Sequence, residues 1–146
     1  MKDPTNASTP IESIMSKHVR QLSETASITD AAMAMRDQQV GGVVVTDDKG
    51  KVTGFVTDRD IVVRSVANGG SPSQTKLRDI CSRDLCCLSP KQSVGDAIGM
   101  MADKAIRRVP VVDKGKVVGI VSLGDLAEHV DPNSVLGRVS AAPPNT

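Results

Sequence analysis

Aromatic residues are almost absent from this sequence, which has one Phe and no Trp or Tyr among 146 residues. Proteins that bind single-stranded nucleic acid usually stack the bases on aromatic side chains, and this chain lacks that platform. Its charge is also balanced, with 18 Lys and Arg against 17 Asp and Glu, so it has no long-range attraction for nucleic acid or anionic membranes. Any site for an anion must therefore be local.

Long apolar stretches are missing as well. No apolar run approaches the roughly 18 residues of a membrane-spanning helix, and residues 1–10 are polar, without the apolar segment of a signal peptide. These features predict a soluble, cytoplasmic protein that binds neither nucleic acid nor membrane.

Cysteine is scarce, and its spacing indicates no metal or disulfide site. Cys81, Cys86 and Cys87 form no CxxC pair, and adjacent cysteines make a poor structural disulfide. A metal site that combined them with His18 or His129 would have no ligand spacing behind it. We expect reduced thiols, partly in the core, and keep redox sensing by Cys86 and Cys87 as an alternative.

The sequence contains an internal repeat. Residues 54–60 read Gly-Phe-Val-Thr-Asp-Arg-Asp, and residues 119–125 read Gly-Ile-Val-Ser-Leu-Gly-Asp. In each copy a glycine opens an apolar strand, and Thr57 or Ser122 closes it. Asp60 or Asp125 then follows three residues later, at the spacing of a helix capping box. The pattern predicts a strand that leads directly into a helix.

The elements around this motif repeat in the same order, strand-helix-strand-strand-helix, with an offset of 66 residues before a hairpin turn and 65 after it. Capping boxes at Ser27 and Ser93 begin the first helix of each copy, and Gly41 and Gly42 are expected to end the earlier one. In the first copy we expect a helical turn over 11–15, strands over 19–22, 43–45 and 51–57, and helices over 28–39 and 58–68. In the second copy we expect a strand at Leu85 and Cys86, a hairpin turn over 113–116 and a final helix over 131–138. The predicted organisation is a flexible lead-in (1–10), repeat one (11–68), a linker (69–76), repeat two (77–130) and a C-terminal segment with a frayed tail (131–146).

One such unit cannot bury its apolar faces alone, so the two copies are expected to pack around a pseudo-two-fold axis as one mixed α/β fold. A helix start attracts anions, and Asp60 and Asp125 could each accept hydrogen bonds from a ribose 2′,3′-diol. Gly54 and Gly119 predict close approach of a ligand or of another backbone. The alternative is that both motifs are only helix caps.

This layout resembles the cystathionine-β-synthase (CBS) domain pair, or Bateman module, over roughly residues 11–130. The resemblance depends on the repeat, on Val-Pro-Val-Val-Asp at 109–113 and on the two glycine-to-aspartate motifs. Residues 57–62, followed by a Gly/Ser/Pro linker, are also similar to stand-alone actinobacterial pairs of the hypoxic-response type.

The resemblance implies an energy-sensing regulatory module that binds adenosine-containing ligands such as AMP, ADP, ATP, NAD or S-adenosylmethionine in clefts between the repeats. It assigns Asp60 and Asp125 to ribose, and Thr57 and Ser122 to ribose or phosphate. It also assigns Arg107 and Arg108 to phosphate. Because Gly41 and Gly42 stand at the matching positions of the first repeat, the two sites should differ; Arg59 is either a further cation for the first site or a solvated side chain. The implied adenine slots are Val19 and Arg20 with Val43 and Val44, and Leu85 and Cys86 with Val109 and Pro110.

The resemblance further implies a homodimer without a required cofactor or metal, and a chain this short is expected to signal through a separate effector protein. We expect no enzymatic activity, because the sequence has no Gly-rich phosphate loop with a Lys and no catalytic triad or metal cluster at suggestive spacing. A ligand-free protein-interaction adaptor is the alternative function.

Overall fold

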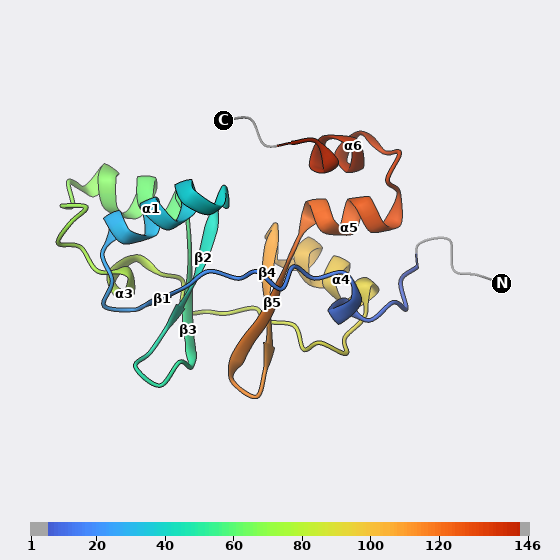
Figure 1. The fold of residues 1–146 in the computed structure, drawn as a ribbon, viewed down its shortest axis with the longest axis horizontal. Helices are drawn as coiled ribbons and strands as arrows, with labels where there is room; N and C mark the ends of the chain where they lie inside the picture. Colours follow the sequence, from blue (N-terminus) through green and yellow to red (C-terminus); the bar gives the residue numbers. More distant parts are fainter. Residues whose placement is uncertain (1–5, 144–146) are drawn as a thin grey trace. The chain divides into compact units, whose positions relative to one another are not determined.

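A computed structural model describes residues 6–143 of the chain, which form two compact units (Figure 1). We call Val19–Leu85 the first-repeat unit. The second-repeat unit consists of Met1–His18 together with Cys86–Thr146, of which 6–18 and 86–143 are described. In these described parts, no helix is long and apolar enough to cross a membrane.

The first-repeat unit is a small sheet with a crossover helix. Its elements are β1 (Gln21–Ser23), α1 (Ile28–Gln38), β2 (Gly42–Thr46), β3 (Val52–Thr57), α2 (Asp58–Asp60), a π-helical turn (Ile61–Ser65), a 3-10 turn (Val66–Asn68) and α3 (Leu77–Ile80). β1 pairs in parallel with β2 through the α1 crossover, and β3 returns antiparallel to β2. Gly69, with φ of 73°, ends the helical stretch after β3, as the sequence predicts.

The second-repeat unit has a related plan, with a two-stranded sheet and one additional helix. Its elements are a 3-10 turn (Ile11–Ser13), α4 (Val94–Lys104), β4 (Arg108–Asp113), β5 (Lys116–Ser122), α5 (Leu123–Val130) and α6 (Val135–Ala141). β4 and β5 form an antiparallel hairpin, closed by Lys114 and Gly115 at φ of 52° and 79°, the left-handed pair that a two-residue hairpin turn requires. α6 lies along α5 (Figure 1). The mixed α/β fold with two repeats of one unit is thus confirmed.

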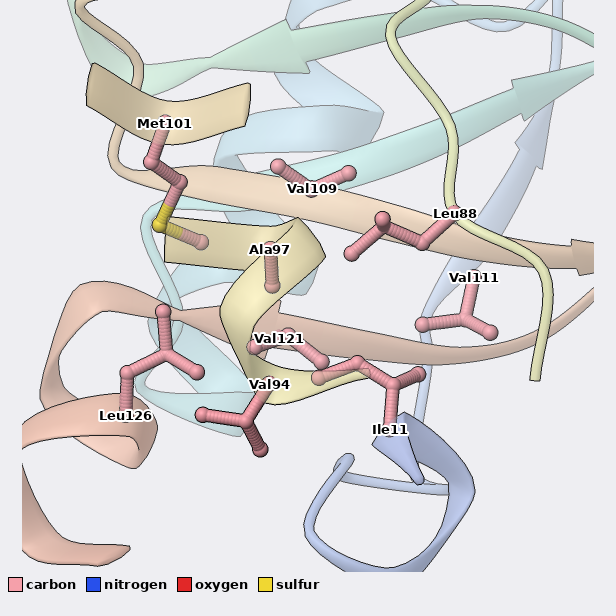
Figure 2. Packing of buried hydrophobic residues seen from close by; sticks show 9 residues of the cluster. All are labelled: Ile11, Leu88, Val94, Ala97, Met101, Val109, Val111, Val121 and Leu126. Carbon is pink, nitrogen blue, oxygen red and sulfur yellow. The ribbon is translucent and has the colours of Figure 1, made fainter. Parts of the chain in front are cut away.

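Each unit has its own hydrophobic core, in which helices cover one face of the strands. Figure 2 shows the core of the second-repeat unit. Fully burying a Val, Leu or Ile side chain contributes about 1.5–3 kcal/mol, so these cores are the main stabilising feature of both units. The second-repeat core consists of Ile11, Leu88, Val94, Ala97, Met101, Val109, Val111, Val121 and Leu126.

The N-terminal part of the chain, up to His18 and including the first residues of repeat one, completes the second-repeat unit. Ile11 is fully buried in the core of the second-repeat unit. Further along, Ser16 and Ile120 exchange two backbone hydrogen bonds of 2.9 Å, which adds a bridge to the free edge of β5. Residues 6–10 also belong here, since Thr9 O accepts a hydrogen bond from Val94 N–H at 2.8 Å.

The first residues of repeat two, up to Leu85, complete the first-repeat unit in the same way. Leu77 is fully buried in that unit's core. Ser82 and Phe55 exchange backbone hydrogen bonds of 3.1 and 3.2 Å along β3. Each repeat therefore receives one edge of its sheet and part of its core from the segment that leads into the other repeat.

The predicted strand at Leu85 and Cys86 is wrong. Pairing occurs further on, as a single parallel bridge between Leu88 and Val111. In the first repeat Val44 N–H donates to Arg20 O at 3.0 Å, and the counterparts of these two residues are Pro110 and Cys86. Proline has no N–H, so Pro110 cannot make the corresponding bond to Cys86.

Three predicted helix boundaries also need correction. The helical turn at 11–15 is limited to Ile11–Ser13, and the last helix is Val135–Ala141 instead of 131–138. α1 ends at Gln38, three residues before Gly41, because Gln39 adopts the left-handed conformation at φ of 54°. The predicted flexible lead-in and frayed tail lie partly outside the described residues, at 1–5 and 144–146.

Candidate functional site

Both glycine-to-aspartate motifs fold as predicted, into a strand followed by a capped helix. Thr57 N–H donates to Asp60 Oδ2 at 2.9 Å, and Asp60 N–H donates to Thr57 Oγ1 at 3.1 Å. Ser122 and Asp125 make the same two hydrogen bonds at the same distances. Each carboxylate is therefore held at a helix start, where the unpaired N–H groups favour negative charge.

The capping geometry alone does not mark a site, because it also occurs elsewhere in the chain. Ser27 with Asp30, and Ser93 with Asp96, form capping boxes with the same distances of 2.9 and 3.1 Å. Those two carboxylates are exposed, whereas Asp60 and Asp125 are half-buried. Burial at the end of a strand is what distinguishes the repeated motif from an ordinary helix cap.

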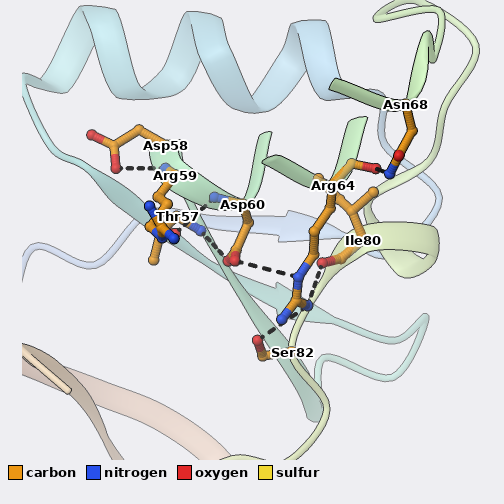
Figure 3. A network of polar contacts seen from close by, with 8 residues as sticks. All are labelled: Thr57, Asp58, Arg59, Asp60, Arg64, Asn68, Ile80 and Ser82. Carbon is orange, nitrogen blue, oxygen red and sulfur yellow. Dashed lines mark hydrogen bonds and ion pairs between the residues drawn. The ribbon is translucent and has the colours of Figure 1, made fainter. Parts of the chain in front are cut away.

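One oxygen of each motif carboxylate is left for another donor. Oδ2 accepts the capping hydrogen bond in both motifs, so Oδ1 is the atom that a ligand hydroxyl would meet. The Asp60 side chain is 17% exposed, and its Oδ1 lies 3.7 Å from Arg64 Nε (Figure 3). The two sites thus offer the same acceptor in different surroundings.

The strand glycines admit another part of the backbone. A Cβ at Gly54 would lie 2.6 Å from Cys81 Sγ and 3.2 Å from Ser82 O. A Cβ at Gly119 would lie 3.0 Å from Ser16 O and still closer to Met15 Sδ. Of the two explanations that the sequence left open for these glycines, close approach of a backbone is the one seen.

The predicted phosphate-binding arginines lie beside one helix start. Arg107 O accepts a hydrogen bond from Leu123 N–H at 2.8 Å, and Arg108 pairs with Ser122 across the hairpin. Both arginine residues are exposed. In the first repeat Gly41 O takes the place of Arg107 O and accepts from Asp58 N–H at 3.0 Å, so the residue that accepts this bond is a glycine and not an arginine.

Arg59, the third predicted cation, is exposed in the first turn of α2. Its N–H donates to Asp58 Oδ1 at 2.8 Å. This contact uses the backbone of Arg59 and leaves the role of its guanidinium a prediction.

The residues predicted to line the first adenine slot come together. Arg20 O accepts a hydrogen bond from Val44 N–H at 3.0 Å, which brings Val19 and Arg20 beside β2. The Val43 side chain belongs to the core of the first-repeat unit. Because successive strand residues point to opposite faces, Val44 lies on the other face of the sheet.

The residues predicted for the second slot are arranged differently. Leu85 and Cys86 are half-buried, and they are the last and first residues of the two units at the crossover. The Val109 side chain lies in the second-repeat core. The hydrogen bond to Pro110 O comes from Leu88 N–H at 3.0 Å, so Leu88 occupies the position that we had expected for Leu85 or Cys86.

A groove of about 520 Å³ lies between α4 and α5 in the second-repeat unit. Its lining is apolar except for Arg107, and includes Ile98, Leu123 and Ala127, whereas Ser122 and Asp125 are not part of it. The sequence analysis missed this groove. Ile98 and Leu123, each about 40% exposed, break the expectation that apolar helix positions are buried, and that pattern could have pointed to it.

Two of the cysteines, Cys81 and Cys87, lie in surroundings that disfavour the thiolate. Burial raises the pKa of the Cys81 thiol and of the Cys87 thiol, and neighbouring Cys86 raises the latter further. A raised pKa lowers the fraction of reactive thiolate. Among residues 6–143, no group of three or more His, Cys, Asp or Glu side chains is arranged to hold a metal ion.

Comparison with known proteins agrees with this architecture. The sequence model of the CBS domain matches residues 11–66 and again 77–132. CBS domain-containing protein YhcV of Bacillus subtilis is 37% identical over 127 residues, which cover 87% of this chain and 89% of that protein. Another curated relative is 36% identical over 111 residues, but the chain spans only 56% of its length.

Solved structures of similar proteins share the fold. Hypoxic Response Protein I, described with two coordinated zinc ions, superimposes with a TM-score of 0.77 at 30% identity, over 83% of this chain and 98% of its own. A protein of that name from Mycobacterium tuberculosis is also a sequence relative, 29% identical over 133 residues, which cover 91% of this chain and 93% of that protein. The CBS domain pair of protein MJ0100, in complex with 5′-methylthioadenosine and S-adenosyl-L-methionine, gives a TM-score of 0.74 at 27% identity, over 82% and 93% of the two chains.

Proposed function

The chain belongs to the CBS-domain family, and from this premise we propose that it is a non-catalytic regulatory module that binds adenosine-containing ligands through Asp60 and Asp125. One observation carries the proposal: each repeat holds a half-buried carboxylate at a helix start with Oδ1 outside the capping box. An acceptor of this kind suits the two adjacent hydroxyls of a ribose. Hydrogen bonds to a charged group contribute about 1.5–3 kcal/mol each.

The ligand class is supported by the relative MJ0100. Both molecules in its complex, 5′-methylthioadenosine and S-adenosyl-L-methionine, contain an adenosine group, which is the part that a ribose-binding carboxylate recognises. We therefore propose adenosine as the common element of the ligands, with AMP, ADP, ATP, NAD and S-adenosylmethionine as candidates. Binding would shift an equilibrium between conformations or between dimer arrangements, and a separate effector protein would respond.

The test uses the four equivalent capping boxes. Asp60→Ala and Asp125→Ala should each weaken binding of AMP or ATP at their own site by roughly 10- to 150-fold, the equivalent of about 1.5–3 kcal/mol, as measured by isothermal titration calorimetry. Asp30→Ala and Asp96→Ala are matched controls, because they remove the same cap hydrogen bond at helix starts outside the motif. The proposal fails if none of the candidate ligands binds the wild-type protein, or if the controls weaken binding as much as the motif variants.

The arginines of the second repeat predict a difference in phosphate preference. Arg107 and Arg108 flank the helix start that holds Ser122, whereas Gly41 flanks the one that holds Thr57. In the variant with both Arg107→Ala and Arg108→Ala, AMP should bind more weakly at the Asp125 site while adenosine binds unchanged. An equal loss for AMP and adenosine would show that the arginines act on the fold and not on phosphate.

We also propose that a second copy of the chain covers the helical faces. Ile98 and Leu123 are exposed at the α4–α5 groove, and in the first-repeat unit Val62, Val63 and Val66 are 58%, 46% and 55% exposed. Monomeric proteins rarely leave large contiguous apolar patches in water. Ala127→Glu, which places a charge in the groove, should lower the dimer fraction in sedimentation velocity. Glu128→Gln on the same helix, at a residue that does not line the groove, should leave that fraction unchanged.

A ligand-free adaptor is the second candidate, and the observation that favours it is the capping box itself. Asp60 and Asp125 serve α2 and α5 as caps whether or not a ligand binds. If adenosine ligands neither bind nor raise the Tm of the wild-type protein, the adaptor becomes the better explanation.

A further inference from the structure

The residue one helical turn after each motif carboxylate differs between the repeats. Arg64 follows Asp60 by four positions, and its Nε lies 3.7 Å from Asp60 Oδ1 (Figure 3). His129 follows Asp125 by four positions. Among the described residues, Asp125 Oδ1 has no ion-pair partner, and His129 Nε2 is buried without a hydrogen-bond partner.

Arg64 also holds the segment that leads out of the first-repeat unit. Its Nη1 donates to Ile80 O at 3.1 Å and lies 3.5 Å from Ser82 Oγ (Figure 3). Asn68 Nδ2 donates to Arg64 O at 3.1 Å, which anchors the backbone of Arg64. One guanidinium therefore joins the candidate ribose-binding carboxylate to the chain just before the crossover after Leu85.

The available oxygen explains why this contact matters. Asp60 Oδ2 already accepts the hydrogen bond from Thr57 N–H, so Oδ1, the atom that faces Arg64, is the oxygen outside the capping box and the one we expect a ribose hydroxyl to approach. A ligand at Asp60 would thus compete with the guanidinium, whereas Asp125 Oδ1 has no ion-pair partner to displace in the described part of the chain. The Arg64 side chain is 50% exposed, and ion pairs this open to water are weak, so the competition is modest and reversible.

We infer that the residue four positions after the motif aspartate sets the relative affinity of the two sites, and that Arg64 makes the first site report its occupancy to segment 80–82. This inference rests on the proposed function, because it assumes that Asp60 and Asp125 receive a ribose. When ribose hydroxyls occupy Asp60 Oδ1, Arg64 moves away from Asp60 and its contacts with Ile80 and Ser82 loosen. In the second repeat, His129 provides no corresponding link.

The affinity test isolates one site at a time, with adenosine as an uncharged probe. In an Asp125→Ala background, Arg64→Gln removes the cation but keeps a hydrogen-bond donor, and adenosine should bind about two- to five-fold more tightly in calorimetry. In an Asp60→Ala background, His129→Arg should weaken adenosine binding by a similar factor, while His129→Gln should not. The proposal is overturned if Arg64→Gln weakens adenosine binding or leaves it unchanged.

Hydrogen exchange tests the link from Arg64 to segment 80–82. An arginine with only a structural role would not transmit ligand binding to that segment. Adenosine should speed exchange of the Ser82 and Phe55 amides, which bond to each other's carbonyls at 3.1 and 3.2 Å, and Arg64→Gln should remove this response. The Ser16 and Ile120 amides of the second-repeat unit are the internal control and should not respond. Unchanged exchange at Ser82 on saturation overturns the inference alone, whereas failure of adenosine and AMP to bind the wild type overturns the proposed function with it.

Discussion

The two units use the same backbone hydrogen bonds to support different side chains. Asp58 N–H donates to Gly41 O at 3.0 Å in one unit, and Leu123 N–H donates to Arg107 O at 2.8 Å in the other. The bond is equivalent, yet one donor-acceptor pair carries an arginine and the other a glycine. Main-chain hydrogen bonds and helix caps therefore determine the backbone structure of the unit. The side chains around the motif can differ between the repeats without changing that backbone.

The helix after the motif shows the same contrast on a larger scale. α5 is a regular helix over Leu123–Val130, whereas the first repeat has only α2 before the chain widens into a π-helical turn over Ile61–Ser65. π turns often occur at functional sites. This one carries Arg64 and the buried Ser65, so the irregular helix coincides with the residues that differ from the second repeat.

The largest expected difference between the units concerns the leucine that pairs with β2 in one unit and with β4 in the other. Leu88 is 1% exposed, whereas its counterpart Leu22 is half-buried beside its core. Leu88→Ala should lower the free energy of unfolding by about 2–5 kcal/mol, and Leu22→Ala by distinctly less, as measured by urea denaturation. Equal losses of unfolding free energy would mean that the two cores depend on this position to the same extent, and would contradict the expected difference between the units.

The next effect concerns the strand glycines. A Cβ at Gly119 would press on Ser16 O at 3.0 Å, and one at Gly54 on Ser82 O at 3.2 Å. We expect Gly119→Ala to lower stability by about 1–3 kcal/mol and Gly54→Ala by somewhat less, because the backbone oxygen is further from the added Cβ at Gly54, while the nearest side chain at each position, Met15 or Cys81, can turn away. In hydrogen exchange, Gly119→Ala should speed exchange of the Ser16 amide, and Gly54→Ala should speed exchange of the Ser82 amide. Faster exchange of both amides in one variant would show that the units do not open separately.

Ser65 should give a smaller effect of opposite sign. Its side chain is 2% exposed, and among the described residues its Oγ has no hydrogen-bond partner, whereas Val130 takes its place in the second repeat. A buried hydroxyl without a partner is unfavourable, so Ser65→Ala should raise the free energy of unfolding by about 1 kcal/mol. A loss of stability would contradict the prediction and would show that Ser65 Oγ makes a stabilising hydrogen bond.

The smallest effect should be the same in both units. Gln39 and Ala105 end α1 and α4 in the left-handed conformation, at φ of 54° and 53°, which glycine adopts without steric cost. Gln39→Gly and Ala105→Gly should each raise the melting temperature slightly, by the equivalent of about 0.5–1 kcal/mol. A gain in only one unit would show that the two helix ends differ in a way that their dihedral angles do not reveal.

Local features of the fold could be predicted from the sequence. Ser27, Thr57, Ser93 and Ser122 each begin a helix as their spacing indicates, because a capping box depends only on residues three positions apart. The hairpin at Lys114 and Gly115 is equally local.

Features that depend on distant parts of the chain could not be predicted in the same way. Nothing near Ile11 indicates that its side chain enters the core of the second-repeat unit. The absence of a strand at Leu85 and Cys86 was in principle readable from Pro110, since a proline cannot donate to a strand ladder. For the candidate site, the sequence predicted the capping boxes of Asp60 and Asp125, but the approach of Arg64 to Asp60 depends on the π-helical turn and on segment 80–82, which no local pattern describes.

The exchange of leading segments has a consequence for how such a chain could have arisen. A protein made of residues 11–68 alone would have Ile11 without the core that buries it, and would lack Leu77 and Ile80 from its own. Two copies of such a peptide could each complete the other by exchanging the segment that corresponds to residues 11–18. Joining two such copies end to end would convert this exchange of segments between two molecules into contacts within one chain.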